Sequence, residues 1–242
     1  LAKNEQLRAN LLRTISHDLR TPLTSISGNA NNLLYNESCL DAQMRRQIYG
    51  DIYDDSMWLI DLVENLLSVT RIEEGRMQIR QSAELVDEVI KEALKHTGQS
   101  RTGRTIKVEE EDELILAKMD ARLIVQVLIN LIGNAVKYTP QGTDITVRVK
   151  KEKAENAERS QVIISVCDLG NGIPDDRKER VFDMFYTGSD QVADSRRSLG
   201  LGLGLCRSII NAHGGKIWIS DNIPHGAVVT FTLPAEEVAL NE

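Results

Sequence analysis

The sequence predicts an α plus α/β chain in two parts: a helical hairpin that forms a dimeric four-helix bundle, followed by a two-layer α/β sandwich. Two observations predict this class. Apolar residues recur at heptad spacing over residues 1–75, which indicates long amphipathic helices. Over residues 76–242, strand and helix patterns alternate instead, which favours helices packed on one side of a sheet. A domain boundary is therefore expected between residues 75 and 76.

Two apolar stripes define the helical part. Residues 36–41 lie between them and predict a short helix–helix connection. Pro22 interrupts the backbone hydrogen bonding of the first helix, so a bend is expected there. One hairpin cannot cover both stripes, and a dimer of hairpins is the economical solution. The stripes are Leu12, Ile15, Leu19, Pro22, Ile26, Asn29 and Leu33, and Ile48, Ile52, Asp55, Leu59, Leu62, Leu66 and Val69.

The second part contains candidates for both strands and helices. Apolar residues alternate cleanly at Val162, Ile164 and Val166, as expected for a strand with one buried face. Two charged stretches are expected to be solvated: residues 109–113 as a turn and residues 150–159 as a hairpin loop. Strands are predicted at 105–108, 145–149, 162–167, 216–219 and 228–233, and helices at 84–96, 121–138 and 203–213.

Composition argues against several classes of protein. A net charge of −7 speaks against a general nucleic-acid binder. Cys39, Cys167 and Cys206 are odd in number and far apart, so neither a disulfide framework nor a metal site is expected. No apolar run approaches the length of a membrane span. Because the chain also begins without Met, we expect a soluble fragment of a longer protein that makes no membrane contact itself.

Residues 16–23 carry the most informative motif, Ser-His-Asp-Leu-Arg-Thr-Pro-Leu. On a helix, His17 and Thr21 share a face, and Asp18 lies beside the histidine. Near pH 7 an imidazole is neutral and nucleophilic. A carboxylate bonded to one ring nitrogen would fix the tautomer and leave the other nitrogen free to attack. The alternative is an incidental surface histidine on a plain coiled coil.

Asn130, Asn134 and Lys137 lie on one face of the predicted helix 121–138, which is otherwise apolar nearly all round. A neutral amide oxygen suits Mg²⁺, which is shared with phosphate oxygens. The lysine adds positive charge for the phosphates. Structurally satisfied core asparagines are the alternative.

Asp168 follows an apolar strand directly and precedes Gly170 and Gly172. An ionised carboxylate only accepts hydrogen bonds, so it can bind the exocyclic amine of adenine and repel the carbonyl of guanine. The glycines let the backbone pass close to a base. An ordinary Asp-Gly turn is the alternative.

A third glycine-rich segment opens the predicted helix 203–213. Gly200, Gly202, Gly204 and Leu205 precede or begin this helix, an arrangement that binds phosphate. It is neither a P-loop nor a convincing dinucleotide fingerprint. The polar segment 187–199 before it predicts a mobile lid. Phe182 and Phe185 either anchor that lid or make simple core contacts.

In this order, the motifs resemble the catalytic core of bacterial two-component sensor histidine kinases, over nearly the whole chain. The histidine box lies at 16–23, the asparagine box at 130–139, the first glycine box at 168–174, the phenylalanine box at 182–185 and the second glycine box at 200–205. The resemblance implies a dimerisation and phosphotransfer domain over 1–75. It implies an ATP-binding domain of the type shared with gyrase and Hsp90 over 76–242.

The resemblance also implies a role for individual residues. His17 matches the phosphorylated residue, Asp18 its general base, and Thr21 the position that orients water in the phosphatase reaction. Asn134 matches the magnesium ligand, with Asn130 and Lys137 on the phosphates. Tyr138 matches a residue near adenine, and Asp168 the adenine selector. One departure is Thr187, where many relatives carry arginine; Arg180, Arg196 or Arg197 are candidates to replace it.

The resemblance therefore implies that the chain autophosphorylates His17 from Mg²⁺-ATP and passes the phosphoryl group to an aspartate of a response-regulator receiver domain. A hinge is expected at residues 73–76, because nucleotide and histidine lie in different domains. The chain would be the cytoplasmic portion of a membrane-bound sensor. Residues 206–217 are similar to those of potassium-responsive sensor kinases. A nucleotide-binding dimeric scaffold and a non-kinase ATPase of the same superfamily are the alternatives.

Overall fold

The computed structural model describes residues 2–36, 39–73, 79–97, 105–111, 114–153, 160–184, 186 and 200–236. For residues 2–15, 17, 18, 61, 69 and 71–73 this description covers the backbone alone. The chain divides into two compact units, which meet in the sequence between Arg71 and Ile72. No helix in the described part of the chain is both long and apolar enough to cross a lipid bilayer.

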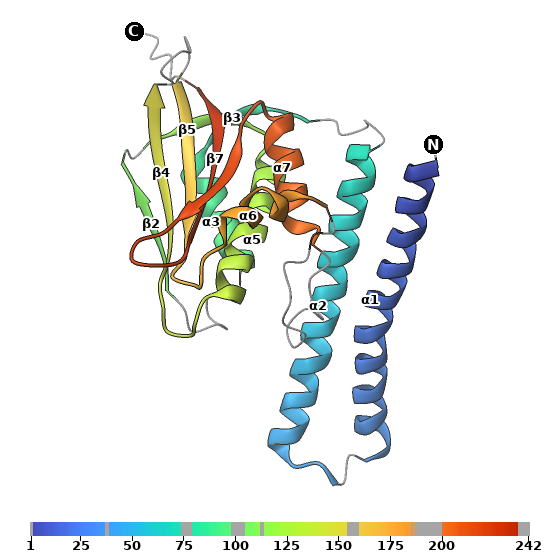
Figure 1. Cartoon of the computed structure of the whole chain (residues 1–242). Coiled ribbons are helices and arrows are strands. Elements are labelled where there is room, and N and C mark those ends of the chain that lie inside the picture. The colour runs from blue at the N-terminus through green and yellow to red at the C-terminus, as the bar shows by residue number, and fades with distance from the viewer. Residues whose placement is uncertain are drawn as a thin grey trace. The chain divides into compact units, whose positions relative to one another are not determined.

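The first unit is a helical hairpin. Helix α1 (Ala2–Tyr35) and helix α2 (Ala42–Glu73) run antiparallel (Figure 1). The predicted connection is confirmed, and Asp41 caps α2 because its carboxylate accepts a hydrogen bond from the Met44 N–H at 2.7 Å. Helix α1 continues through Pro22, which is buried.

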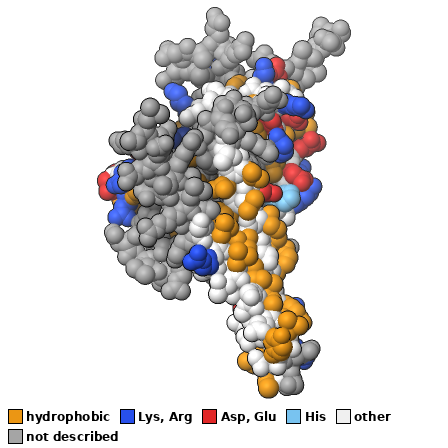
Figure 2. All heavy atoms as spheres, turned by 90° about the vertical axis from the view of Figure 1, so that its right-hand side faces the viewer, with side chains coloured by type: hydrophobic (Ala, Val, Ile, Leu, Met, Phe, Trp, Pro, Cys, Tyr) orange, Lys and Arg blue, Asp and Glu red, His pale blue; other side chains and the backbone are white. Residues whose placement is uncertain are grey.

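The predicted stripes of the hairpin are only partly covered within a single chain. Every described side chain of both stripes is buried or half-buried, with Leu62 only 6% exposed. A different row of α2 remains open instead. This exposed apolar row consists of Tyr49, Tyr53, Met57, Ile60, Val63 and Leu67, each at least 39% exposed. Figure 2 shows hydrophobic side chains gathered along the hairpin. Helix α2 therefore carries two apolar faces, the predicted stripe and the exposed apolar row.

The second unit is built on a mixed sheet of seven strands. Six of them follow the order β1-β3-β7-β5-β4-β2, and the seventh, β6, pairs with β7. β2 and β4 pair in parallel, and the other pairs are antiparallel. The strands are β1 (Ser82–Leu85), β2 (Ile106–Glu110), β3 (Leu116–Met119), β4 (Ile145–Lys153), β5 (Ser160–Cys167), β6 (Ile217–Asp221) and β7 (Ala227–Glu236).

Three helices cover one face of this sheet, as predicted for a two-layer sandwich (Figure 1). They are α3 (Val86–His96), α5 (Ala121–Tyr138) and α7 (Gly202–Ala212). Alternate strand residues such as Val147, Ile164 and Phe231 face them and are fully buried. The short helices α6 (Asp175–Lys178) and η2 (Arg180–Phe182) lie between β5 and α7 in the sequence.

Several predicted boundaries are wrong. The four-residue strands β1 and β3 were not expected, and the helix predicted from residue 84 begins at Val86 because Glu84 and Leu85 pair with β3. Glu109 belongs to β2 rather than to a turn, where Arg148 of β4 pairs with it at 2.8 Å. Residues 150–153 extend β4 rather than forming a loop. Residues 154–159 lie outside the described part.

Candidate functional site

Asp168 stands at the end of β5 with one carboxylate oxygen fixed by the backbone. Its Oδ1 accepts hydrogen bonds from the Gly170 N–H at 2.8 Å and the Ala227 N–H at 3.1 Å. No described residue donates to Oδ2. The side chain is half-buried. The carboxylate is therefore held in one orientation and keeps one oxygen for an external donor.

The glycines around Asp168 allow segments of the chain to approach closely. A Cβ at Gly170 would lie 2.7 Å from the Tyr138 carbonyl oxygen, so only glycine lets this turn contact the end of α5. Gly226 has a φ of +112°, and a Cβ there would lie 2.0 Å from the Asp168 carbonyl oxygen. Gly170 thus has a role within the fold, and its predicted approach to a base stays a prediction.

Helix α5 presents the predicted polar face. The Asn130 and Asn134 side chains are half-buried, and Lys137 is exposed with its ammonium 5.0 Å from the centre of the Tyr138 ring. The Asn130 Nδ2 is buried and makes no hydrogen bond of ordinary geometry. No described residue bonds the Asn134 amide. Buried amides normally have partners, so the Asn134 amide retains capacity to bind a ligand, whereas the Asn130 amide neighbours the Cys206 thiol.

The start of α7 lies against the same helix. Gly200 has a φ of +65°, and a Cβ at Gly202 would lie 3.7 Å from the Asn130 Oδ1. Gly204 packs on the phenylalanine-containing segment, because a Cβ there would lie 3.2 Å from the Phe182 carbonyl oxygen. Leu205 is fully buried. Helix α5 therefore joins both glycine-rich segments, with Asn130 beside Gly202 and Tyr138 beside Gly170.

The phenylalanine segment is only partly described. Phe182 is 2% exposed and packs with Ile219 and Ala227, so it makes a core contact. Phe185 lies outside the described residues, as do the predicted lid 187–199, Arg196 and Arg197. The Arg180 guanidinium lies 4.9 Å from the centre of the Tyr186 ring.

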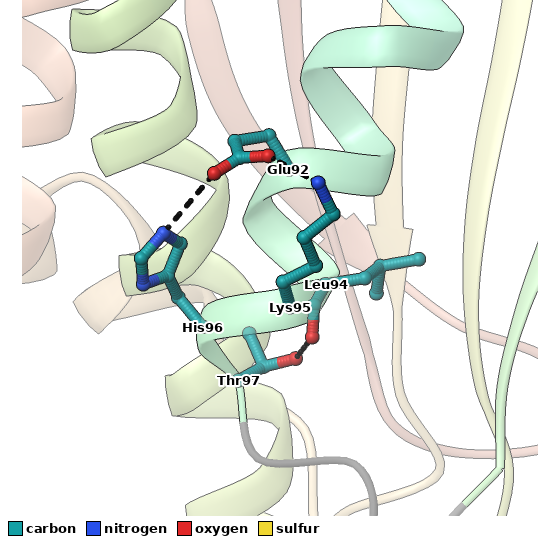
Figure 3. Close-up of polar contacts among 5 residues, drawn as sticks. All are labelled: Glu92, Leu94, Lys95, His96 and Thr97. Carbon is teal, nitrogen blue, oxygen red and sulfur yellow. Dashed lines mark hydrogen bonds and ion pairs between the residues drawn. The ribbon is translucent and has the colours of Figure 1, made fainter.

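His96, His213 and His225 have different hydrogen-bond or ion-pair partners. His213 is buried, accepts the Asp120 N–H on Nε2 at 3.0 Å and donates from Nδ1 to the Ile209 carbonyl at 2.7 Å, which fixes one neutral tautomer. Exposed His96 lies 3.4 Å from the Glu92 carboxylate at the end of α3 (Figure 3). His225 Nδ1 bonds the Gly170 carbonyl at 3.1 Å.

The predicted phospho-acceptor segment is helical. His17, Asp18 and Thr21 all belong to α1, so His17 and Thr21 are one turn apart on one helix face. The Thr21 side chain is exposed. The side chains of His17 and Asp18 lie outside the described part, and so do residues 74–76 of the predicted hinge.

Sequence reasoning missed three residues around Asp168. Asn222, His225 and Ala227 come from the β6–β7 turn and strand β7, and they bond the Asp168 and Gly170 segment. No local pattern marks them, because they meet Asp168 only through the β5–β7 pairing. Among the described residues, no group of three or more His, Cys, Asp or Glu side chains is arranged to hold a metal ion.

Two family models match the chain. The model "Histidine kinase-, DNA gyrase B-, and HSP90-like ATPase" matches residues 119–237, and "His Kinase A (phospho-acceptor) domain" matches residues 7–75. The phospho-acceptor match includes His17, and the ATPase match includes Asn130, Asn134 and Asp168.

Similar proteins cover nearly all of the chain. The sensor protein KdpD of Clostridium acetobutylicum is 42% identical over 97% of this chain and 25% of its own length. The adaptive-response sensory kinase SasA of Gloeothece citriformis is 30% identical over 97% of this chain and 59% of its own length. This chain thus spans between a quarter and three fifths of these relatives.

Solved structures agree with the sequence comparisons. The catalytic domain of histidine kinase ThkA is 31% identical with a TM-score of 0.51, over 64% of this chain and 95% of that one. Histidine kinase ThkA in complex with response regulator protein TrrA is 25% identical with a TM-score of 0.65, over 97% of this chain and 64% of that one.

Proposed function

This chain belongs to the sensor histidine kinase family, and on that premise we propose that it transfers the γ-phosphoryl group of ATP to His17 and then to an aspartate of a response regulator. The observation that carries the proposal is the coexistence in one chain of a phospho-acceptor segment and an ATPase segment. His17 is the one histidine within residues 7–75. We assign phosphotransfer to residues 1–75 and ATP binding to residues 76–242.

Asp168 recognises adenine in this proposal. Its free Oδ2 accepts a hydrogen bond from the exocyclic amine, while Oδ1 stays on the Gly170 and Ala227 N–H groups. Guanine presents a carbonyl oxygen at that place, which the carboxylate repels. Tyr138, 56% exposed and adjacent to Gly170, lies near the base. Gly172 belongs to the same turn.

Asn130, Asn134 and Lys137 hold the phosphates. Asn130, Asn134 and the exposed ammonium of Lys137 lie on one face of α5, and the start of α7 lies beside the Asn130 Oδ1. Gly200, Gly202 and Gly204 lie at the N-terminus of α7, where the first N–H groups of a helix favour anions. Leu205 completes this first turn, since its N–H donates to the Leu201 carbonyl at 2.9 Å. A neutral oxygen on Asn134 fits Mg²⁺, which would neutralise phosphate charge.

Phosphoryl transfer needs little from the protein beyond positioning. A ring nitrogen of His17 attacks the γ-phosphorus, an N–P bond forms, the bond to the bridging oxygen breaks, and ADP leaves. Asp18 orients the imidazole and takes the proton from its other nitrogen. Thr21 holds a water molecule in the phosphatase reaction, in which the phosphoryl group of the response regulator is hydrolysed.

We propose that the hairpin pairs with a second copy of itself through the exposed apolar row of α2. Six large apolar side chains along one helix are unfavourable in water, and a four-helix bundle buries them. The chain would form the cytoplasmic portion of a longer sensor, in keeping with the quarter of KdpD that it spans.

Labelling with γ-³²P-ATP tests the proposed function. We expect a phosphoprotein whose label is lost in acid and kept in base, as a phosphoramidate requires, and whose label moves to a receiver domain. Omission of Mg²⁺ is the control and should prevent labelling. ATP hydrolysis without a labelled protein would indicate an ATPase, and binding without either reaction a scaffold.

A further inference from the structure

The turn between β6 and β7 lies directly against the Asp168 segment. Asn222 Nδ2 donates a hydrogen bond to the Asp168 carbonyl oxygen at 2.7 Å. His225 Nδ1 lies 3.1 Å from the Gly170 carbonyl oxygen. Because a carbonyl only accepts, this nitrogen carries the proton and donates. One short turn thus bonds both residues at the ends of the Asp168–Gly170 segment.

These contacts restrain the backbone around the N–H groups that bond the Asp168 carboxylate. Asp168 Oδ1 is fixed by the N–H groups of Gly170 and Ala227. His225 restrains Gly170, and Ala227 follows the turn directly. Asn222 restrains the Asp168 backbone, which also donates to the Ala227 carbonyl at 2.9 Å. The direction of the free Oδ2 therefore depends on the β6–β7 turn.

The turn itself is well defined. The Asn222 N–H donates to the Gly226 carbonyl at 3.0 Å, and its Oδ1 accepts from the Ile223 N–H at 3.0 Å. The second bond sets the orientation of the amide, so that Nδ2 faces Asp168. Gly226 lets the turn approach, since any Cβ there would meet the Asp168 carbonyl.

We propose that Asn222 and His225 are positioning residues that determine adenine selectivity through Asp168. The inference rests on the proposed function of Asp168 as the adenine selector. Neither side chain bonds the Asp168 carboxylate, so both act through the backbone of the Asp168–Gly170 segment.

His225 is the better probe because its side chain is exposed and its replacement should not unfold the protein. His225→Leu removes the donor, whereas His225→Asn places an amide N–H near the position of Nδ1. Loss of one hydrogen bond predicts an ATP affinity about two- to tenfold lower in His225→Leu, with recovery in His225→Asn. KM for ATP should rise and the autophosphorylation rate at saturating ATP should stay constant. His96→Leu, at the exposed end of α3, is the matched control (Figure 3).

Asn222→Asp is a second, nearly isosteric probe. It keeps the acceptor for the Ile223 N–H and replaces the donor by an oxygen that repels the Asp168 carbonyl. ATP affinity and the preference for ATP over GTP should both fall, as measured by calorimetry on the full chain. Thermal unfolding of each variant shows that the fold is retained.

Asp168→Ala separates the two ideas. If Asp168→Ala loses adenine preference while His225→Leu and Asn222→Asp keep it, the positioning inference is wrong and the selector stands. If Asp168→Ala itself keeps full adenine preference, both are wrong. Equal loss in His225→Leu and His225→Asn would also overturn the inference, because the donated bond would then be irrelevant.

Discussion

Asp168 has a structural role in addition to the adenine recognition that we propose for it. Its two carboxylate oxygens differ, because Oδ1 accepts two backbone N–H groups and Oδ2 accepts none from the described residues. This asymmetry decides what a substitution does. The predicted position of Asp168 directly after a strand is confirmed, since β5 ends at Cys167, and its role toward adenine stays a prediction. The direction of Oδ2 could not be predicted, because Ala227 reaches Asp168 only through sheet pairing.

Asp168→Asn should change base preference rather than merely weaken binding. The amide oxygen remains on the two N–H groups, so Nδ2 turns toward the base and meets the amine of adenine donor to donor. Loss of the charge-assisted bond costs up to about 1.5–3 kcal/mol of ATP affinity, while the carbonyl of guanine gains a donor. Calorimetry with ATP and GTP measures the ratio. An unchanged ratio would place the selector elsewhere.

Cys206 makes stability depend on pH. Burial raises the pKa of its thiol to about 12, and the neighbouring Asn130 amide opposes that rise. The unfolded thiol ionises near its ordinary value of 9.0, so the unfolded state loses its proton first. The free energy of unfolding should therefore fall as pH rises from about 9 to 12. Denaturant titrations should show a smaller fall in Cys206→Ala, and an identical fall would mean that Cys206 does not contribute.

The elements show where pattern reasoning succeeds. Helix α5 was predicted with its observed bounds, because eighteen residues of strong apolar pattern lie between Asp120, which caps it, and Pro140. β1 and β3 were missed because four residues carry too little alternation to detect. Glu109 and Lys150 were predicted to lie in solvated segments outside strands. The prediction was wrong because the residues that pair with them on neighbouring strands are distant in the sequence, so no local pattern indicates the pairing.

The exposed apolar row of α2 should hold the dimer together. Leu67 is half exposed in the single chain, so Leu67→Glu leaves the hairpin intact but buries an unpaired charge in the bundle. That burial should cost several kcal/mol of association free energy. Light scattering should report a monomer for Leu67→Glu. Gln47→Glu, exposed on the same helix outside the row, is the control and should remain dimeric. A wild-type chain that is monomeric at micromolar concentration would contradict the bundle.

At the scale of the whole molecule, the proposed phosphoryl acceptor and the proposed nucleotide ligands lie in different units. His17 belongs to the first unit, and Asp168, Asn130 and Asn134 belong to the second. In the proposed function, phosphoryl transfer therefore requires both units, because His17 and the proposed nucleotide ligands lie in different ones. The order of motifs indicated this division, because each motif lies wholly on one side of residue 75. The topology of the sheet could not be predicted, because β7 pairs with three strands, β3, β5 and β6, that are scattered along the sequence.

Thr21→Ala should separate the two activities. The threonine is exposed one turn from His17, where its hydroxyl can hold a water molecule, and autophosphorylation does not need that hydroxyl. Decay of regulator phosphate should slow much more than the labelling rate with ATP. Thr24→Ala, whose hydroxyl bonds the Arg20 carbonyl at 2.8 Å, is the control and should affect neither. Equal loss of both activities in Thr21→Ala would make Thr21 structural.

The central claim is that ATP bound in the second unit phosphorylates His17. It is tested most directly by His17→Gln, measured for ATP affinity by calorimetry and for labelling by γ-³²P-ATP in the same preparation. The account predicts wild-type affinity and no acid-labile label, because the nucleotide site is built entirely from other residues. Labelling at the wild-type rate in His17→Gln would contradict it.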